Sequence, residues 1–230
     1  MNDVLRQEKK LLVTRQEMGL FAGKLAKVLR ADPHNGPAGY AIRSLYFDTL
    51  DDGDFWEKID GVEVRRKLRL RCYGPGDGTA KLELKQKQGE YQRKRSLPVC
   101  GADAEALWRG DYRPLLGLGD PFAAECYSLL CAGCYRPRAL VEYRRLAFVA
   151  RENETRLTFD SEVRATESCF DLFSPALCLY PVLDPWQVVL EVKYNGFLLG
   201  YIQDLLAGVD RRTLSVSKYA LSRSAVYGAL

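Results

Sequence analysis

A regular alternation of charged and apolar side chains over several short segments is the feature that most constrains the fold of this chain. The segment VRRKLRLRCY, residues 64–73, places Arg69 and Arg71 at alternate positions and Leu68 and Leu70 between them. The same two-residue period recurs in residues 80–87, 155–164 and 188–194. Because successive side chains of a β-strand point to opposite faces, each segment predicts a strand with one charged and one apolar face.

The whole sequence predicts eight strands separated by turns and helices. The turn sequences GPGDG and QGE join three of the strands as hairpins. The expected strands cover residues 6–13, 41–48, 64–73, 80–87, 91–99, 139–151, 155–164 and 188–194. This number of antiparallel strands with helices inserted between them indicates an α+β protein whose sheet can close into a barrel.

Helices are expected in four places. One begins at Thr14, which forms a capping box with Glu17, and ends near residue 30. Two more cover residues 198–207 and 217–227, the second with Ser217 as its N-cap. A helical insertion covers about residues 102–134 and is interrupted near two prolines. We expect residues 1–230 to form a single domain that contains this insertion.

The charged faces of the predicted strands allow two arrangements. In the first, each charged face is the solvent side of a sheet that packs on a core. In the second, helices cover the apolar faces from outside, and the charged faces turn inward in a closed barrel. Several of the charged faces are strongly basic, and an inward basic face needs a highly anionic ligand because buried unpaired charge is costly. Phosphate chains match the donors of Arg and Lys.

Composition excludes several other kinds of site. The single histidine, His34, lies in a loop-like sequence, which argues against Ser-His or Cys-His catalysis and against two-histidine metal sites. Cys131 and Cys134 form one CxxC without a second, so buried or half-buried thiols are the simpler interpretation. A net charge of +4 is mild, and the basic positions lack interleaved aromatic residues, so we do not expect nucleic-acid binding.

Location is predicted from the absence of two signals. The first residues, MNDVLRQEKK, lack the apolar region of a signal peptide, and no run approaches the roughly 20 apolar residues of a membrane span. The seven cysteines are an odd number and scattered, which indicates reduced thiols. We therefore expect a cytoplasmic protein without a membrane segment.

Eight blocks in order along the chain resemble the VTC-type polyphosphate polymerase domain of the CYTH or triphosphate tunnel metalloenzyme superfamily. The blocks are RQEKKLLV, SLYFDT, VRRKLRLRCYG, LELKQK, VEYRRLAFVA, TRLTFDSEVRA, LEVKYNG and SVSKYALSR. Many members of the superfamily begin with ExExK, whereas this chain has Arg6, Glu8 and Lys10, as in the VTC-type branch. The resemblance implies a closed eight-stranded antiparallel tunnel, with helices outside, that binds triphosphate with a divalent cation.

The resemblance also implies roles for individual residues. Catalytic and phosphate-binding positions match Lys10, Arg69, Arg71, Lys85, Arg145, Arg156 and Lys218. Ser217 matches the serine before Lys218, and Lys87 and Lys193 share the charged faces, so these three are expected to contact substrate. Glu191 and Glu8 are the expected ligands of Mn²⁺ or Mg²⁺, although a salt bridge remains an equal alternative for each.

Three activities fit these expectations. The first is transfer of the γ-phosphate of ATP or another nucleoside triphosphate onto a polyphosphate chain, with ADP as the product. The second is hydrolysis of triphosphate or polyphosphate in the same tunnel. The third is a sensor that binds polyphosphate or nucleotide without turnover. The reaction products distinguish the three.

Overall fold

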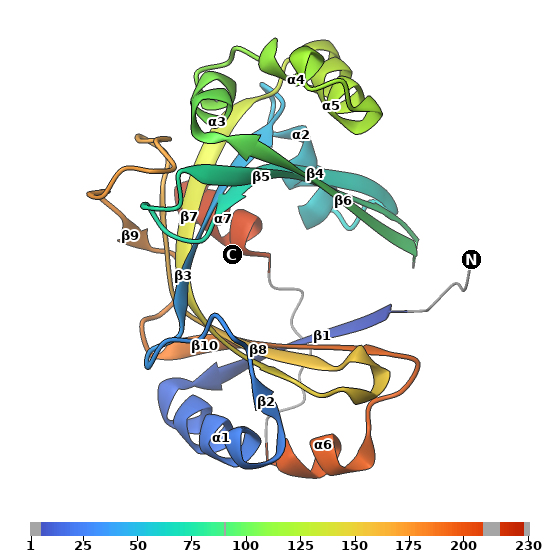
Figure 1. The fold of residues 1–230 in the computed structure, drawn as a ribbon, viewed down its shortest axis with the longest axis vertical. Coiled ribbons are helices and arrows are strands. Elements are labelled where there is room, and N and C mark those ends of the chain that lie inside the picture. The colour runs from blue at the N-terminus through green and yellow to red at the C-terminus, as the bar shows by residue number, and fades with distance from the viewer. Residues whose placement is uncertain (1–5, 90, 209–216, 228–230) are drawn as a thin grey trace. The chain divides into compact units, whose positions relative to one another are not determined.

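The computed structural model describes residues 6–89, 91–208 and 217–227 (Figure 1). The strands are β1 (Arg6–Thr14), β2 (Arg30–Ala31), β3 (Tyr40–Asp48), β4 (Val64–Cys72), β5 (Thr79–Gln88), β6 (Tyr91–Cys100), β7 (Arg136–Val149), β8 (Arg156–Thr166), β9 (Tyr180–Pro181) and β10 (Gln187–Asn195). The helices are α1 (Arg15–Val28), α2 (Gly53–Ile59), α3 (Gly101–Trp108), α4 (Pro114–Gly117), α5 (Pro121–Ala132), α6 (Gly200–Leu205) and α7 (Lys218–Tyr227), and Glu152–Glu154 form one 3₁₀ turn.

The strands form a large antiparallel sheet with the order β1-β10-β8-β7-β3-β4-β5-β6, to which β2 and β9 add short pairings on β7 and β8. The α+β class and the antiparallel sheet predicted from the sequence are confirmed. The order is a linear path that ends at β1 and β6, so closure of the sheet into a barrel is not confirmed.

The chain divides into two compact units. Unit 1 contains Met1–Ala41, Tyr143–Val163 and Leu183–Ser217, and unit 2 contains Ile42–Glu142, Arg164–Val182 and Lys218–Leu230. Each unit has its own hydrophobic core between one face of its strands and its own helices.

In unit 1, α1 and α6 cover one face of β1, β10, β8 and the second half of β7 (Figure 1). Phe21 and Leu25 of α1 and Ile202 of α6 pack on Leu190 of β10 and Phe159 of β8, all of them buried. The α1 helix begins with the predicted capping box, in which Glu17 N donates to Thr14 and the Glu17 side chain accepts from Thr14 N.

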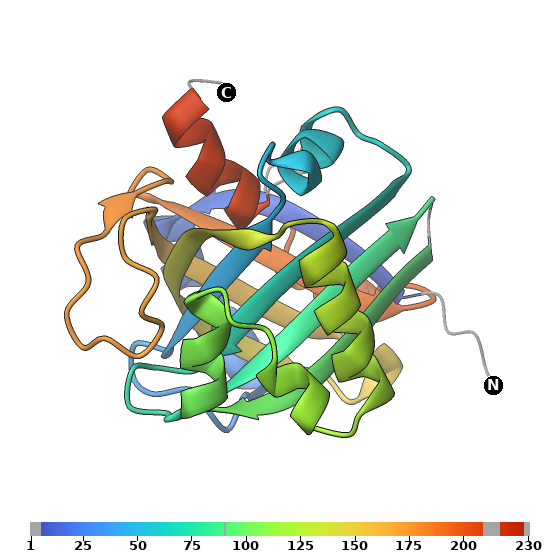
Figure 2. The ribbon, with the colours of Figure 1, turned by 90° about the horizontal axis from the view of Figure 1, so that it is seen from above.

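In unit 2, α3, α4 and α5 cover one face of β3, β4, β5 and β6 (Figure 2). The leucines of the alternating segments supply the sheet side of this core, and Leu107 of α3 and Leu130 of α5 supply the helix side. The three helices are the predicted insertion, with breaks before Pro114 and Pro121. The charged face of the strands is the one that these helices leave uncovered.

The eight predicted strands agree with β1, β3, β4, β5, β6, β7, β8 and β10 to within three residues at each end. The short strands β2 and β9 and the helix α2 were not predicted. The start of α2 depends on a distant side chain: Asp48 Oδ1 accepts from Asp54 N, and Asp48 Oδ2 accepts from Phe55 N. No helix of the described residues is long and apolar enough to cross a membrane.

Candidate functional site

The predicted site residues fall into two groups, one in each unit. In unit 1, the group consists of Glu8 and Lys10 on β1, Arg145 on β7, Arg156 on β8, and Glu191 and Lys193 on β10. In unit 2 it consists of Arg69 and Arg71 on β4, Lys85 and Lys87 on β5, and Lys218 at the start of α7. Ser217 is buried and directly precedes α7.

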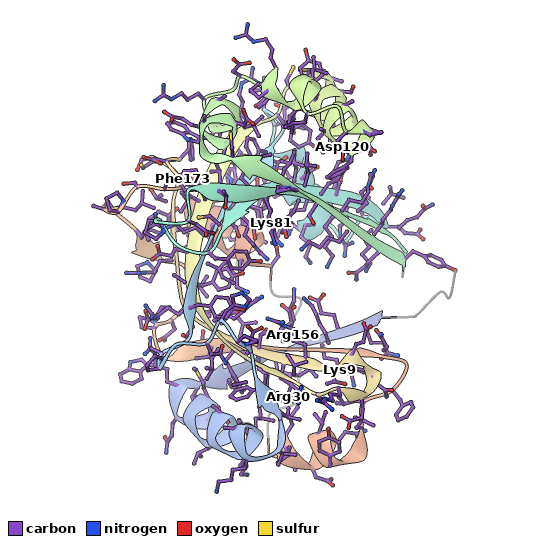
Figure 3. The ribbon with its side chains drawn as sticks, viewed as in Figure 1. Lys9, Arg30, Lys81, Asp120, Arg156 and Phe173 are labelled. Atoms are coloured by element: carbon purple, nitrogen blue, oxygen red, sulfur yellow. The ribbon has the colours of Figure 1, made fainter. Side chains whose placement is uncertain are left out.

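Positive charge accumulates on the face of unit 2 that lies opposite α3 to α5. Cross-strand pairing places Lys67 beside Lys85, and Lys85 beside Lys94 of β6. Over β4, β5 and β6 this face carries eight cationic side chains and one carboxylate: Arg65, Lys67, Arg69, Arg71, Lys81, Lys85, Lys87 and Lys94, with Glu83. Figure 3 shows Lys81 on this face. Like charges on neighbouring strands repel each other, so this face favours an anionic ligand.

Glu83 partly neutralises this face. Arg69 Nε donates to Glu83 Oε2 over 2.7 Å, and Lys94 Nζ donates to Glu83 Oε1 over 2.5 Å. Arg71 Nη1 lies 3.7 Å from the same carboxylate. Burial alone would raise the pKa of Glu83, but the charges of these three cations lower it to about 2. The carboxylate is therefore ionised at neutral pH and orients the arginines.

Two stacked tyrosines lie beside the cations. The rings of Tyr46 on β3 and Tyr219 on α7 are 5.0 Å apart, and Lys67 Nζ lies 5.9 Å from the first ring and 5.8 Å from the second. Arg69 donates to the Tyr46 hydroxyl over 3.2 Å. Burial raises the pKa of Tyr46, but the charges of Arg69, Arg71 and Lys218 outweigh it and lower that pKa overall. Lys218 and the two β4 arginines therefore act on the same hydroxyl.

Asp48 fixes the N-terminal end of α7 to the sheet. This fully buried carboxylate accepts a 2.5 Å hydrogen bond from the Tyr219 hydroxyl in addition to the backbone donors of α2. Arg223, one turn further along α7, pairs with Asp52 and with Glu167. These contacts orient the first residue of α7, Lys218, relative to β3 and β4.

In unit 1, cations and carboxylates alternate on the face opposite α1 and α6. Lys10 of β1 lies across from Glu191 of β10, and Glu8 lies across from Lys193. Lys10 Nζ is 2.9 Å from Glu8, and Lys193 forms an ion pair with Glu191. The salt bridges left open by the sequence are therefore present in the structure.

Arg145 and Thr158 extend the same face. Arg145 donates from Nε and Nη2 to the two oxygens of Asp160, over 2.7 and 2.8 Å. Thr158 lies across from Glu191, and its hydroxyl is buried without a hydrogen-bond partner among the described residues. A buried hydroxyl without a partner costs free energy, so an additional donor or acceptor from a ligand would stabilise it.

Arg156 sits at the edge of this face, and Figure 3 shows it on the side away from α1. Its Nη2 lies 2.6 Å from Asp32 and donates to the Tyr40 hydroxyl over 3.2 Å. Gly39 brings Tyr40 to this place: it has φ +75°, and a Cβ there would meet the Arg145 carbonyl oxygen at 2.2 Å. Only glycine fits so close to β7 in that backbone conformation.

The two predicted metal ligands lie on the charged face of unit 1. Glu8 and Glu191 project from neighbouring strands at diagonal positions of one face. In the part of the chain that the structure describes, no group of three His, Cys, Asp or Glu side chains could hold a metal by itself. Mg²⁺ and similar ions are often held by one or two carboxylates together with substrate phosphates. Glu8 and Glu191 fit a metal bound in that manner.

Sequence reasoning did not assign a role to Glu83, Lys94, Tyr46, Thr158 or Asp32. The two-residue alternation in residues 80–87 and 155–164 puts Glu83 and Thr158 on charged faces, which is the signal that could have identified them. The contact of Lys94 with Glu83 depends on the register between β5 and β6, and the contact of Asp32 with Arg156 depends on the position of a loop. The local sequence pattern contains neither.

Fold and site together define an α+β protein whose antiparallel strands carry a helix-covered apolar face and a charged face, with an excess of Arg and Lys on the charged face of unit 2. The chain belongs to the VTC domain family, whose model matches residues 5–227. This match confirms the resemblance drawn from the eight sequence blocks.

Two solved structures share the fold. A Hippeastrum protein described as a candidate adenylyl cyclase with a dominant triphosphatase activity matches with a TM-score of 0.56 and 13% sequence identity, over 95% of this chain and 95% of that chain. A candidate adenylate cyclase of Bacillus halodurans matches with a TM-score of 0.50 and 13% identity, over 93% of this chain and 95% of that chain. No curated protein matches the chain by sequence.

Proposed function

We propose that this VTC-family protein is a metal-dependent phosphotransferase that moves the γ-phosphate of ATP onto a polyphosphate chain. The observation that carries the proposal is the excess of cations on the face of unit 2 opposite α3 to α5, eight against one carboxylate. A solvated surface of mixed charge would not concentrate basic side chains in this way, whereas a linear polyanion balances them.

The proposal includes closure of the sheet into the eight-stranded tunnel that the family resemblance implies. Each unit's group of cations binds phosphate oxygens. In unit 2 the phosphate oxygens are bound by Arg69, Arg71, Lys85 and Lys218, and Lys87 extends this row. In unit 1 they are bound by Lys10, Arg145 and Arg156, with Lys193 and Ser217 as further contacts.

In phosphoryl transfer the protein mainly positions the reacting groups and neutralises their charge. An oxygen of the terminal phosphate of the acceptor chain forms a bond to the γ-phosphorus, the bond from that phosphorus to the bridging oxygen breaks, and ADP leaves. Arg69 and Arg71, oriented by Glu83, bind the equatorial oxygens. Lys218, held by the docking of α7, binds the transferring phosphoryl group or the acceptor.

Glu8 and Glu191 would hold a divalent metal, Mn²⁺ or Mg²⁺, with phosphate oxygens as its remaining ligands. When bound, the metal would supply neutralisation of the phosphate charge. The lysines now paired with these carboxylates, Lys10 and Lys193, would then become available to phosphate oxygens.

A second candidate function is hydrolysis, with water in place of the acceptor phosphate. It is favoured by the shared fold with the Hippeastrum protein, which has a described triphosphatase activity. A third, a sensor for polyphosphate or nucleotide, uses the same cations without turnover. The same cation arrangement would serve all three.

One incubation distinguishes these functions. Purified protein is mixed with ATP, Mn²⁺ and a short polyphosphate primer, and polymer, ADP and orthophosphate are measured separately. Lengthening polymer with matching ADP supports the phosphotransferase. Orthophosphate without polymer moves the protein to the triphosphatases, and tight binding without turnover makes it a sensor.

Variants test the assignment of residues. Arg69→Ala and Lys10→Ala, one from each unit, should each weaken tripolyphosphate binding at least tenfold, because each loses a charge-assisted contact. Lys27→Ala, an exposed lysine on α1, removes the same charge and should leave affinity unchanged. Full affinity in either variant would show that the substituted residue does not bind the anion.

A further inference from the structure

The loop between β2 and β3 contains an acidic residue that contacts one of the proposed phosphate-binding arginines. Asp32 is 5% exposed, and its Oδ2 lies 2.6 Å from Arg156 Nη2. Its Oδ1 accepts from His34 N over 2.9 Å and lies 2.8 Å from His34 Nδ1. One carboxylate is therefore shared between an arginine of the cationic face and the only histidine of the chain.

The loop is fixed to the sheet, so this geometry is built into unit 1. Asp32 N donates to the Ala147 carbonyl over 2.9 Å, and the Asn35 side chain both donates to and accepts from the backbone of Ala147. These bonds hold the Asp32 carboxylate at the edge of β7 and β8. The buried Asp32 carboxylate is thus a fixed feature of unit 1, and the 77% exposed His34 side chain lies against it.

We propose that Asp32 is a positioning residue that holds the Arg156 guanidinium on the cationic face of unit 1, and that a bound polyphosphate competes with Asp32 for this arginine and leaves the carboxylate to His34. The inference rests on the proposed function in one respect, namely that Arg156 binds an anion. Asp32 lies outside the expected phosphate-binding residues, and it couples one of them, Arg156, to the titratable side chain of His34.

The coupling has a definite sign. When phosphate takes the arginine, the charge of Asp32 is less compensated, so a proton on His34 becomes more favourable. By linkage, protonated His34 then favours anion binding by the same factor. Affinity should therefore rise as pH falls through the titration of His34.

Four groups lie around His34 in the described part of the chain. Asp32 lies in the same loop, and the Tyr40 ring at the start of β3 is 6.0 Å away. Arg156 of β8 lies behind Asp32, and Arg144 of β7 donates to the carbonyl of Ala38 in this loop. Of these, Asp32 is the carboxylate in contact with the imidazole.

Because the chain has one histidine, its imidazole signal in proton NMR can be followed without assignment. The pKa of His34 is measured with and without saturating tripolyphosphate in the wild type and in Asp32→Asn. We expect tripolyphosphate to raise the pKa by about 0.3–0.5 unit in the wild type and by less than about 0.1 unit in Asp32→Asn. Equal shifts in both proteins, or none in the wild type when tripolyphosphate binds, would overturn the inference.

A second variant tests the shared carboxylate without any anion. Arg156→Gln should raise the pKa of His34 in the ligand-free protein, because Asp32 loses its other partner. An unchanged pKa there shows that Asp32 does not connect the two side chains, whatever Asp32→Asn does to folding. The failure of wild-type protein to bind tripolyphosphate would instead overturn the proposed function, and with it the anion competition.

The pH dependence of affinity completes the test. Tripolyphosphate itself titrates near neutral pH, so wild type is compared with His34→Gln by calorimetry at pH 5.5 and 8. Wild type should gain about twofold more affinity than His34→Gln on lowering the pH. Identical pH dependence would show that His34 is not coupled to the anion.

Discussion

Glu83 lies directly across from Arg69 on neighbouring strands and accepts a 2.7 Å hydrogen bond from its Nε. Lys94 and Arg71 contact the same carboxylate, so one buried acid is surrounded by three cations. The Glu83 carboxylate therefore stabilises the cationic face of unit 2 in the ligand-free protein. It yields the first prediction.

Glu83→Gln should destabilise the ligand-free protein by about 2 kcal/mol, because three cations lose the one carboxylate that they all contact. Tripolyphosphate should restore much of the lost stability, since it replaces the missing negative charge and binds only the folded state. Thermal melts with and without tripolyphosphate measure both effects. Glu105→Gln, which breaks an exposed pair with Arg109, is the matched control and should show neither effect. A melt of Glu83→Gln that tripolyphosphate does not move would contradict the prediction.

The hydroxyl of Thr158 yields a second prediction. Thr158→Val keeps the shape of the side chain and removes a buried hydroxyl that has no partner among the described residues. If the hydroxyl binds a phosphate oxygen, tripolyphosphate affinity should fall about fivefold, which corresponds to one hydrogen bond, while the free energy of unfolding stays equal or rises.

Thr155 provides a matched control for this variant. Its hydroxyl is equally buried and without a partner in the described part of the chain, but alternation places it with Leu157 on the apolar side. Thr155→Val should leave affinity unchanged. Equal affinity of wild type and Thr158→Val in calorimetry would show that this hydroxyl does not contact the anion.

Docking of α7 through Tyr219 yields a third prediction. Tyr219→Phe removes the 2.5 Å hydrogen bond to buried Asp48, so it should lower both the free energy of unfolding, by about 1–2 kcal/mol, and the affinity for tripolyphosphate, because Lys218 is no longer held in place. Tyr112→Phe removes a comparable buried bond, to the Tyr135 carbonyl on the helix side of unit 2. It should lower stability without changing affinity. The link between Tyr219 and Lys218 is wrong if both variants bind tripolyphosphate like wild type.

Asp54 in α2 yields a prediction about pH. Burial, with the charge of Asp48 as a second cause, raises the pKa of Asp54 to about 7, although a hydrogen bond from Tyr135 opposes the change. The folded state therefore keeps a proton that the unfolded state releases above pH 4. The stabilisation is complete below pH 4 and is lost as pH rises through 7, by about 2–4 kcal/mol.

Asp54→Asn should remove this loss, because the amide keeps an acceptor for Tyr135 and cannot ionise. Urea unfolding at pH 5.5 and 8 measures the effect, and the variant should be the more stable protein at pH 8. Asp204→Asn, at an exposed position of α6, should follow the wild-type pH dependence. A wild type that is equally stable at both pH values would show that Asp54 is ionised in the folded protein.

Local patterns predicted most of the regular structure. The two-residue alternation in residues 64–73 predicted β4 almost to the residue, and the Thr14–Glu17 capping box predicted the start of α1. Both signals depend on neighbours in the chain, and for that reason a single sequence contains them. The start of α2 was missed because its cap comes from Asp48, at the end of a strand, and not from the residue that precedes the helix.

The residues of the candidate site were likewise predictable in part from local pattern and in part only from the folded chain. Alternation along each strand predicted which side chains share a face, such as Arg69 with Arg71 and Glu191 with Lys193, because covalent geometry points successive strand side chains to opposite faces. Which face the helices cover, and which residues pair across strands, as Lys85 pairs with Lys94, became known from the folded chain. Those contacts depend on strand register and on the burial of apolar surface between segments far apart in the chain, which alternation does not specify.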